Sequence, residues 1–438
     1  MTGSCHACGV NSGDPLPGGA AREAFDDELD LVRRSGLVLR VGRMSLASGT
    51  GSYRVKGSMA HVAKALGITR HQALVTLTEI TTTSHRNSSF RTEVAEIRDV
   101  GVNADRLARL QLLVSSLRGK SIEPDELERR LDEIEQTGPL YSPGLSALWA
   151  GIACASFAFL LGLGWVAMLG ALLGAGAGQF SRRMLARQRY NQIGVTMIAA
   201  AVASGIYLGV VTLVGFTGVG FDADQAGFIA AVLFLVPGFP LVTASLDLAR
   251  LDISAGIARL TYAIVIVCAA AVVVWGISYL LGGNAAHLSS SDPSLALRAA
   301  QLLATFAGVL GFALMFNSPA RMALAAATVA FIPNVARIVL TDAGVPPAVA
   351  TALAAFVVGL IAAYLAPRLH VPRITVSVPA VVIMVPGTTT YLAMSGLGDG
   401  ATSEALGYAV QAVVVVLGIA VGLAVARMVT DREWAFEK

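Results

Sequence analysis

Two helix-breaking motifs interrupt the apolar parts of this sequence. The stretch LVPGFPL contains Pro237 and Gly238, and the stretch MVPGTTT contains Pro386 and Gly387. Proline removes a backbone donor and frees a carbonyl one turn earlier, while glycine lets backbone approach a solute or a crossing helix. At membrane depth, irregular backbone is tolerated only where it is buried in protein or lines a watery cavity. The pair of breaks therefore predicts a binding site, with kinks in packed helices as the simpler interpretation.

Polar side chains follow both breaks. Thr243 and Asp247 are four residues apart after the first break, so they share a face if the segment is helical. Ionisable groups inside a membrane are functional candidates by default. Asp247 is therefore interpreted either as a carrier of a coupling proton or as a headgroup-level partner of Arg250. The hydroxyls after the second break suit a small zwitterion or carboxylate, and they belong to Thr388, Thr389, Thr390 and Tyr391.

Two further motifs place amides and arginines in the C-terminal half. MFNSPAR contains Asn317 and Arg321 at a turn, and IPNVAR contains Asn334 and Arg337 inside an apolar run. An arginine within a span indicates a carboxylate site or an ion pair. Arg337 is also only a few residues from the end of its run, so its side chain could instead extend to the membrane surface.

The composition identifies the setting of these motifs. The chain has 438 residues, of which 55% are hydrophobic and only 14% charged, with a mean hydropathy of +0.67. Soluble domains carry about 25% charged residues, so we expect a polytopic α-helical membrane protein. Each apolar run approaches the ~20 residues that a spanning helix needs. The ten expected spans are about 145–161, 164–181, 193–214, 225–246, 259–281, 299–316, 320–340, 346–366, 375–395 and 405–427.

Arginine placement predicts the direction of the spans. One set of connections carries nine arginines, and the other set carries none but holds several acidic residues. Positive charge concentrates on the cytoplasmic side, so both termini are expected there. The nine arginines are Arg182, Arg183, Arg187, Arg189, Arg250, Arg259, Arg321, Arg368 and Arg373.

The chain divides into a polar head and an apolar remainder. Apolar residues at helical spacing predict helices over 25–49, 58–67, 103–119 and 123–138, and β-branched alternation predicts strands over 71–85 and 90–98. The expected parts are a disordered tail (1–24), a cytoplasmic α+β domain (25–140), two five-helix membrane repeats (145–281 and 299–428) and a cytoplasmic tail (429–438).

The two membrane parts are expected to be inverted repeats. A shift of 149 positions superimposes Pro237 and Gly238 on Pro386 and Gly387. Five spans is an odd number, so the two parts would enter the membrane from opposite sides. Inverted repeats with broken helices near the bilayer centre are typical of secondary transporters. The two breaks would then face each other across a central site.

The sequence resembles the bacterial threonine/serine exporters from about residue 25 to 430. The resemblance rests on the head segment LVLRVGRMSLASGTGSYRVKGSMAHVAKALG, on TEITTT and RTEVAEIR, and on LVPGFPLVTASLDL, FNSPARMALAAATVAFIPNVAR and PAVVIMVPGTTTY. It implies ten spans behind a cytoplasmic head and proton-driven export of small hydroxy amino acids. A related two-protein form, similar to this architecture cut between the halves, is associated with succinate export.

These observations favour a proton-coupled exporter of threonine and serine, with a dicarboxylate exporter using Arg337 or Arg321 as the alternative. No nucleophile motif supports a membrane-anchored hydrolase, and no charged rings indicate a channel. The expected partners are a small-molecule substrate, protons and the lipid bilayer, without nucleic acid or cofactor; the oligomeric state is left open. Cys5, His6 and Cys8 provide too few ligands to predict a metal site.

Overall fold

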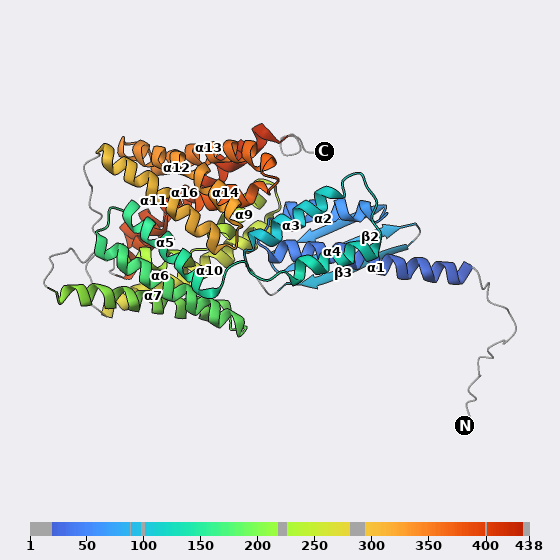
Figure 1. Ribbon diagram of the computed structural model, residues 1–438, viewed down its shortest axis with the longest axis horizontal. Coiled ribbons are helices and arrows are strands. Elements are labelled where there is room, and N and C mark those ends of the chain that lie inside the picture. Colours follow the sequence, from blue (N-terminus) through green and yellow to red (C-terminus); the bar gives the residue numbers. More distant parts are fainter. Residues whose placement is uncertain are drawn as a thin grey trace, which may run out of the picture.

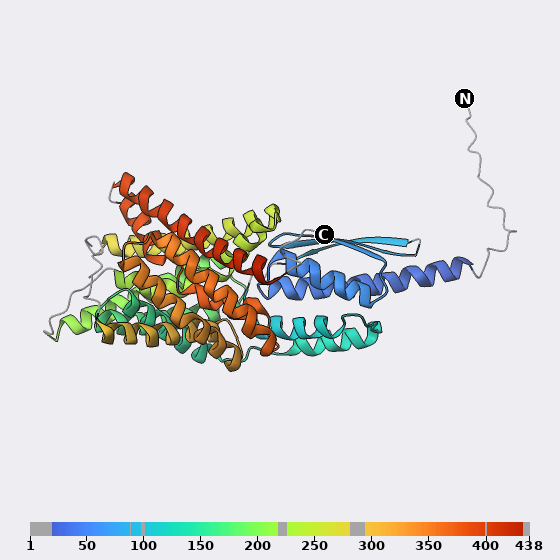
Figure 2. The same cartoon turned by 90° about the horizontal axis from the view of Figure 1, so that it is seen from above.

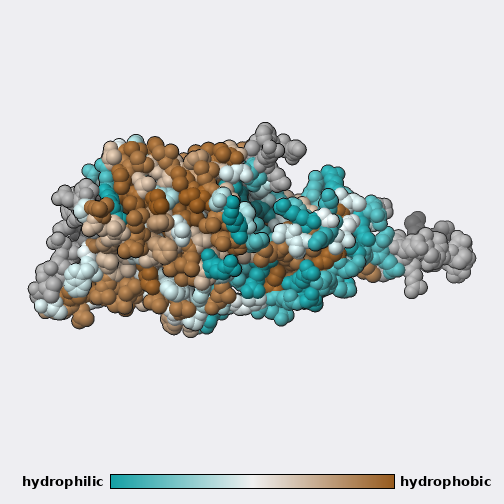
Figure 3. Space-filling view, turned by 45° about the horizontal axis from the view of Figure 1, so that its top comes forward, coloured by the Kyte–Doolittle hydropathy of each residue, from teal (hydrophilic) through white to brown (hydrophobic). Residues whose placement is uncertain are grey.

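The protein has two parts at opposite ends of an elongated molecule (Figures 1 and 2): a bundle of long helices and a smaller mixed head. The computed structural model describes residues 20–87, 89–97, 101–217, 226–280, 294–398 and 401–431. Apolar residues cover the face of the helical bundle in Figure 3, and polar residues gather over the head.

In its described residues the head has four helices and a three-stranded antiparallel sheet in the order β1-β2-β3. Its elements are α1 (Ala20–Ala47), α2 (Ser52–Ala65), β1 (Arg70–Val75), β2 (Glu79–Arg86), β3 (Ser89–Glu96), α3 (Ala104–Ser116) and α4 (Pro124–Gln136). The α+β character is confirmed. Helix α1, however, begins at Ala20, inside the segment expected to be a disordered tail.

The single strand expected over 71–85 is wrong, because the structure has a hairpin there. The turn is closed by the Thr76 amide donating to the Glu79 carbonyl (2.9 Å) and the Glu79 amide donating to Thr76 Oγ1 (3.1 Å). The turn contains none of the glycine, proline or asparagine residues that usually mark a hairpin. Threonine supplies the turn hydrogen bond instead, so the sequence pattern gives no sign that one strand ends and another begins.

The helical bundle follows the expected order of apolar runs. Its elements are α5 (Pro143–Leu160), α6 (Trp165–Arg187), α7 (Gln192–Gly215), α8 (Ala226–Val232), the 3-10 turn η1 (Leu233–Leu235), α9 (Gly238–Ala249), α10 (Ile253–Leu280), α11 (Leu295–Met315), α12 (Ala320–Asp342), α13 (Pro347–Arg368), α14 (Arg373–Val382), α15 (Gly387–Gly398) and α16 (Thr402–Thr430). Each expected span therefore coincides with one helix or with an interrupted pair.

Seven of these helices are long and apolar enough to cross a membrane, and an eighth span is formed if the bent pair Gly227–Leu235 and Gly238–Ala249 counts as one. The chain is thus a multi-pass membrane protein. Helix α6 ends in an arginine-rich turn, and α14 and α15 are each too short to cross alone. The total of ten spans and the inverted repeat stay predictions.

Small residues let the long helices approach closely. A Cβ placed on Gly418 of α16 would lie 2.6 Å from the Ala348 carbonyl oxygen of α13, and Gly422 is packed in the same way against Ala352. Glycine at helix crossings is the common device for close packing in membranes, where no hydrophobic force drives helices together. The contact between α13 and α16 therefore depends on the absence of a side chain.

We expect Gly418→Ala to lower the melting temperature of the detergent-purified protein. The added methyl group meets backbone, which cannot rotate away, and overpacking of this kind costs about 1–3 kcal/mol. Gly407→Ala is the matched control on the same helix, since a Cβ there meets nothing within 4 Å. Equal melting temperatures for the two variants would contradict the packing of α13 on α16.

Candidate substrate site

The first Val-Pro-Gly motif forms a tight turn that separates two helices. Pro237 has φ −79° and ψ 63°, and the Gly238 amide donates to the Val236 carbonyl at 2.8 Å. These are the features of an inverse γ-turn centred on proline. The helices on either side are bent by 63°, so the chain changes direction inside the apolar bundle.

The second motif forms a turn with the same hydrogen bond. The Gly387 amide donates to the Val385 carbonyl, again at 2.8 Å. The hydroxyls of Thr389 and Thr390 donate to the Pro386 carbonyl at 3.0 and 2.9 Å. The Thr390 amide donates to the same carbonyl at 3.1 Å, so the Pro386 carbonyl begins the hydrogen bonding of helix α15. The side chains of Thr388 and Tyr391 lie outside the described residues.

The two breaks contact each other. A Cβ on Gly238 would lie 2.9 Å from Cγ2 of Val382, at the end of α14. A Cβ on Gly387 would lie 2.9 Å from Cδ1 of Leu233, in η1. Each glycine therefore packs on the break from the other half of the chain. The surrounding side chains are buried and apolar, so the two turns meet in a closed contact.

A buried polar cluster lies further along α9, after the first break. Asp247 and Arg259 are 2% and 3% exposed in their side chains and form an ion pair of 3.1 Å between Oδ2 and Nε. Arg259 also donates to Thr243 Oγ1 at 3.4 Å, so one guanidinium connects Thr243 with Asp247. Its Nη2 is buried without a hydrogen-bond partner among the described residues. This cluster can bind a carboxylate through Arg259 and an ammonium group or a proton through Asp247.

The head covers this cluster directly. The Ser52 amide, at the start of α2, donates to Asp247 Oδ2 at 3.2 Å, so the positive end of α2 faces the carboxylate. Lys56 forms an ion pair with Asp252, and Arg250 lies 4.1 Å from the ring centroid of Tyr53. Arg250 therefore contacts the head, while the ion pair of Asp247 is with Arg259.

A second polar cluster joins α11 and α12. Asn334 is fully buried; its Nδ2 donates to Thr305 Oγ1 at 2.9 Å, and its Oδ1 accepts from Arg337 Nε at 3.1 Å. One turn beyond Thr305, Gly308 packs on Ile383 next to the second break. Asn334 and Arg337 are thus brought together on α12 close to the second break, a position that the sequence did not indicate, and Arg337 has a polar partner within the bundle.

Asn317 lies elsewhere, at the junction with the head. Its backbone has φ 62°, a conformation that asparagine tolerates better than most residues. Its Nδ2 donates to Asn103 Oδ1 and its Oδ1 accepts from the Leu140 amide, both at 2.8 Å. The first amides of α3 donate to the carbonyls of Phe316 and Asn317. The turn between α11 and α12 therefore caps a helix of the head.

Arg259 and Ser52 belong to the site although no sequence pattern indicates them. Arg259 reads as one of the positive charges of the connections, because no local pattern shows that it folds back onto α9. Arg250 is closer to Asp247 along the chain, but α9 ends there and Leu251 turns the backbone with φ 61°. Ser52 belongs to a separate part of the chain, so only tertiary structure brings it to Asp247.

An interrupted helical bundle, two facing breaks and buried charge within a multi-pass membrane protein are features of the transporter class. A family model described as "Putative threonine/serine exporter" matches residues 36–281, more than half of the chain, and one described as "Threonine/Serine exporter, ThrE" matches residues 301–429. The chain belongs to the threonine/serine exporter family and is a membrane transporter rather than an enzyme.

The curated relatives of this chain carry two kinds of name. The "Probable threonine/serine exporter" of Mycobacterium tuberculosis is 24% identical over 93% of this chain and 80% of its own length. The "Probable succinate transporter subunit YjjP" of Escherichia coli is 27% identical over 55% of this chain and 94% of its own length. The "Threonine/serine exporter" of Corynebacterium glutamicum is 27% identical over 37% of this chain and 34% of its own length. No solved structure matches the chain.

Proposed function

We propose that this protein is a secondary active exporter of L-threonine and L-serine across the bacterial plasma membrane, driven by protons. The observation that carries the proposal is membership of the exporter family over both halves of the chain. The relative from Mycobacterium tuberculosis, which aligns with 93% of this chain, is also named for these substrates. The head and both termini are proposed to be cytoplasmic, because the arginine-rich connections lie on the head side.

The proposed transport cycle uses alternating access around the two Val-Pro-Gly turns. Gly238 and Gly387 each pack on the opposite break, and the apolar side chains around them close the space between the two turns. Separation of these two turns would expose their backbone carbonyls and the threonine hydroxyls after Pro386 to a solute. Such polar backbone at membrane depth suits the ammonium and hydroxyl groups of a small amino acid.

Asp247 is the proposed proton carrier, and Arg259 the proposed partner of the substrate carboxylate. The two groups neutralise each other in the closed arrangement (3.1 Å). Protonation of Asp247 would release Arg259 to bind an anion, which gives a physical link between proton binding and carboxylate binding. Thr243, which accepts from Arg259, would then lie beside the bound substrate.

The test is counterflow into liposomes containing the purified protein. We expect saturable uptake of labelled threonine and serine that responds to an imposed pH gradient. A protein that stays folded, yet moves neither amino acid under any gradient, would exclude this function and leave only the transporter architecture.

Succinate is the second candidate substrate, because the relatives named YjjP are similar to this chain over more than half its length. A dicarboxylate needs a second cation, and Arg337, which donates to Asn334 inside the bundle (3.1 Å), is the candidate in the second half. If succinate outcompetes threonine in the same liposomes, we expect Arg337→Gln to abolish its uptake. Arg321→Gln is then the comparison variant, because Arg321 is exposed and is the other arginine that the sequence suggested for binding a dicarboxylate.

A further inference from the structure

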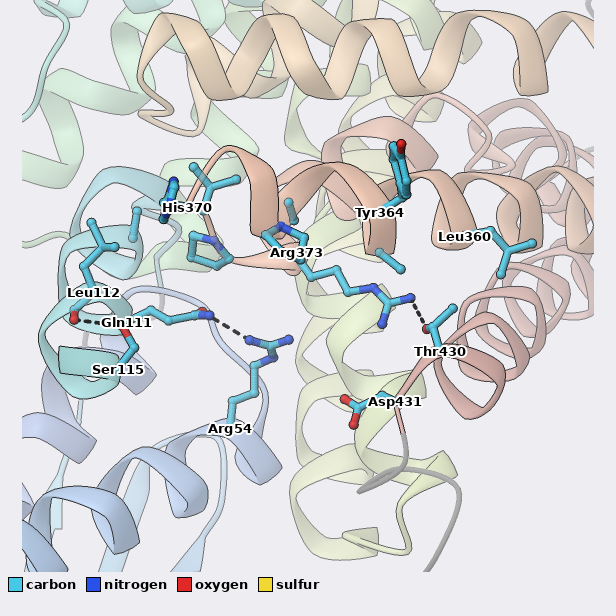
Figure 4. A pocket seen from close by; sticks show the side chains of 16 residues that line it. Arg54, Gln111, Leu112, Ser115, Leu360, Tyr364, His370, Arg373, Thr430 and Asp431 are labelled. Carbon is cyan, nitrogen blue, oxygen red and sulfur yellow. Dashed lines mark hydrogen bonds between the residues drawn. The ribbon is translucent and has the colours of Figure 1, made fainter. Parts of the chain in front are cut away.

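A cavity of about 610 Å³ lies at the junction between the head and the helical bundle. Its walls come from α2 and α3 on one side and from the ends of α13, α14 and α16 on the other (Figure 4). The volume falls in the range of small-molecule sites, about 300–1,000 Å³. The cavity is separate from the two breaks and from the cluster around Asp247.

Arginines from both parts of the protein face this cavity. Arg54 of α2 and Arg373 of α14 line it, and Asp431 is the acidic residue in the same lining. A small second cavity, of about 20 Å³, continues from Arg373 into the bundle and is lined by Ser377 and by the buried Arg427. Among the described residues at this place, three guanidinium groups thus gather around one carboxylate.

Arg54 has hydrogen-bonding capacity left over. Its Nη1 donates to Gln111 Oε1 at 3.2 Å, but its Nε is buried and has no partner among the described residues. Arg373, by contrast, donates to the Gly359 carbonyl (2.9 Å) and to Thr430 Oγ1 (2.7 Å). Burial, together with the charge of Arg373, lowers the pKa of Arg54 to about 10. Arg54 is therefore still charged at neutral pH, and among the described residues Asp431 offsets its charge only in part.

We infer that this junction cavity binds an oxyanion, a carboxylate or phosphate group, between Arg54 and Arg373. Buried charge is stabilised by a partner of opposite sign, and guanidinium groups bind carboxylate and phosphate through paired hydrogen bonds. The group can come from a soluble metabolite or from the headgroup of an anionic lipid. Because the two arginines belong to different parts of the protein, the bound anion would connect the head to the bundle.

This inference does not depend on the transported substrate, so its test measures stability rather than transport. Full-length protein, purified in neutral detergent without phosphate, is titrated with succinate or inorganic phosphate against sodium chloride at equal ionic strength. A second arm compares nanodiscs of phosphatidylcholine with nanodiscs that also contain phosphatidylglycerol. We expect a saturable rise in melting temperature in at least one arm, and the arm that responds identifies the source of the anion.

Variants connect the rise to the cavity. Arg54→Gln should weaken the apparent affinity at least about tenfold, the scale of one lost charge-assisted hydrogen bond, and Arg54→Lys should restore part of it. Arg187→Gln, an exposed arginine at the end of α6, is the charge-matched control. Ser115→Glu places a carboxylate at an exposed position of the lining and should also reduce the response, which covers the case of an unstable Arg54 variant.

Two results would overturn the inference. One is the absence of a saturable shift with both soluble anions and with phosphatidylglycerol. The other is a shift that is equal in the unmodified protein, in Arg54→Gln and in Ser115→Glu, since the anion would then act away from this cavity.

Discussion

Replacing Asp247 with asparagine is expected to destabilise the protein by about 3–5 kcal/mol, because it leaves Arg259 buried without a counter-charge. Both side chains are almost fully buried, and the Ser52 amide donates to the same carboxylate. The substitution therefore weakens the bundle and its contact with the head together. The measurement is the melting temperature in detergent, combined with protease sensitivity of residues 138–142 between the two parts.

Asp252→Asn is the matched control. Asp252 follows the same helix and pairs with Lys56 of the same head helix, but that pair is partly exposed and should contribute only about 0–1 kcal/mol. The double variant Asp247→Asn with Arg259→Gln should recover much of the lost stability, because it removes the uncompensated charge. If Asp247→Asn and Asp252→Asn were equally stable, and the double variant recovered no stability, the ion pair between Asp247 and Arg259 would not stabilise this region.

Asp247→Asn alone, assayed below its melting temperature, tests proton coupling, because it keeps Arg259, the proposed partner of the substrate carboxylate. Transport of threonine that no longer responds to a pH gradient would support Asp247 as the proton carrier. Retained coupling in this variant would assign the carboxylate a role in positioning the head.

Gly238→Ala is expected to reduce transport by about fivefold or more, whereas Gly387→Ala is expected to have a small effect. The methyl group at position 238 would lie 2.9 Å from Cγ2 of Val382, a β-branched side chain with little rotational freedom in a helix. At position 387 it would meet the terminal Cδ1 of Leu233, which can move aside. Overpacking of about 1–3 kcal/mol at the first site corresponds to a change of roughly 5- to 150-fold in an equilibrium between states.

The rescue experiment is Val382→Ala combined with Gly238→Ala. Removing the methyl groups of Val382 makes room for the new side chain, so the double variant should regain transport relative to Gly238→Ala alone. Initial rates of counterflow, normalised to folded protein, are the measurement. If Gly387→Ala were the more harmful single variant, the contact between the two breaks would differ from the one described.

The sequence predicted the helical architecture well, since apolar runs carry the signal that fixes membrane helices. It also placed both breaks, because proline and glycine act locally: the two Val-Pro-Gly motifs form the same three-residue turn. The expected facing of the breaks has support in the packing of Gly238 on Val382. The hairpin at Thr76 was missed because threonine, rather than glycine or asparagine, supplies its hydrogen bond.

The partners of polar residues were harder to predict, since they depend on which helices meet. Asn334 and Arg337 are three residues apart on one helix, and their contact follows from helical spacing. The contacts of Asn317 with Asn103 and Leu140 cross between separate parts of the chain, and no local pattern indicates them. The same holds for Arg54 and Arg373, which look like ordinary surface charges in the sequence.

The head is attached to both halves of the bundle at once. Ser52 and Lys56 contact the end of α9 and the turn after it, while Asn103 and Leu140 contact the turn between α11 and α12. Any rocking of one half against the other must therefore release the head from at least one side. The strength of these contacts would then contribute to the activation barrier of the transport cycle. Weaker contacts between the head and the bundle would therefore raise the turnover rate and make the resting state less stable.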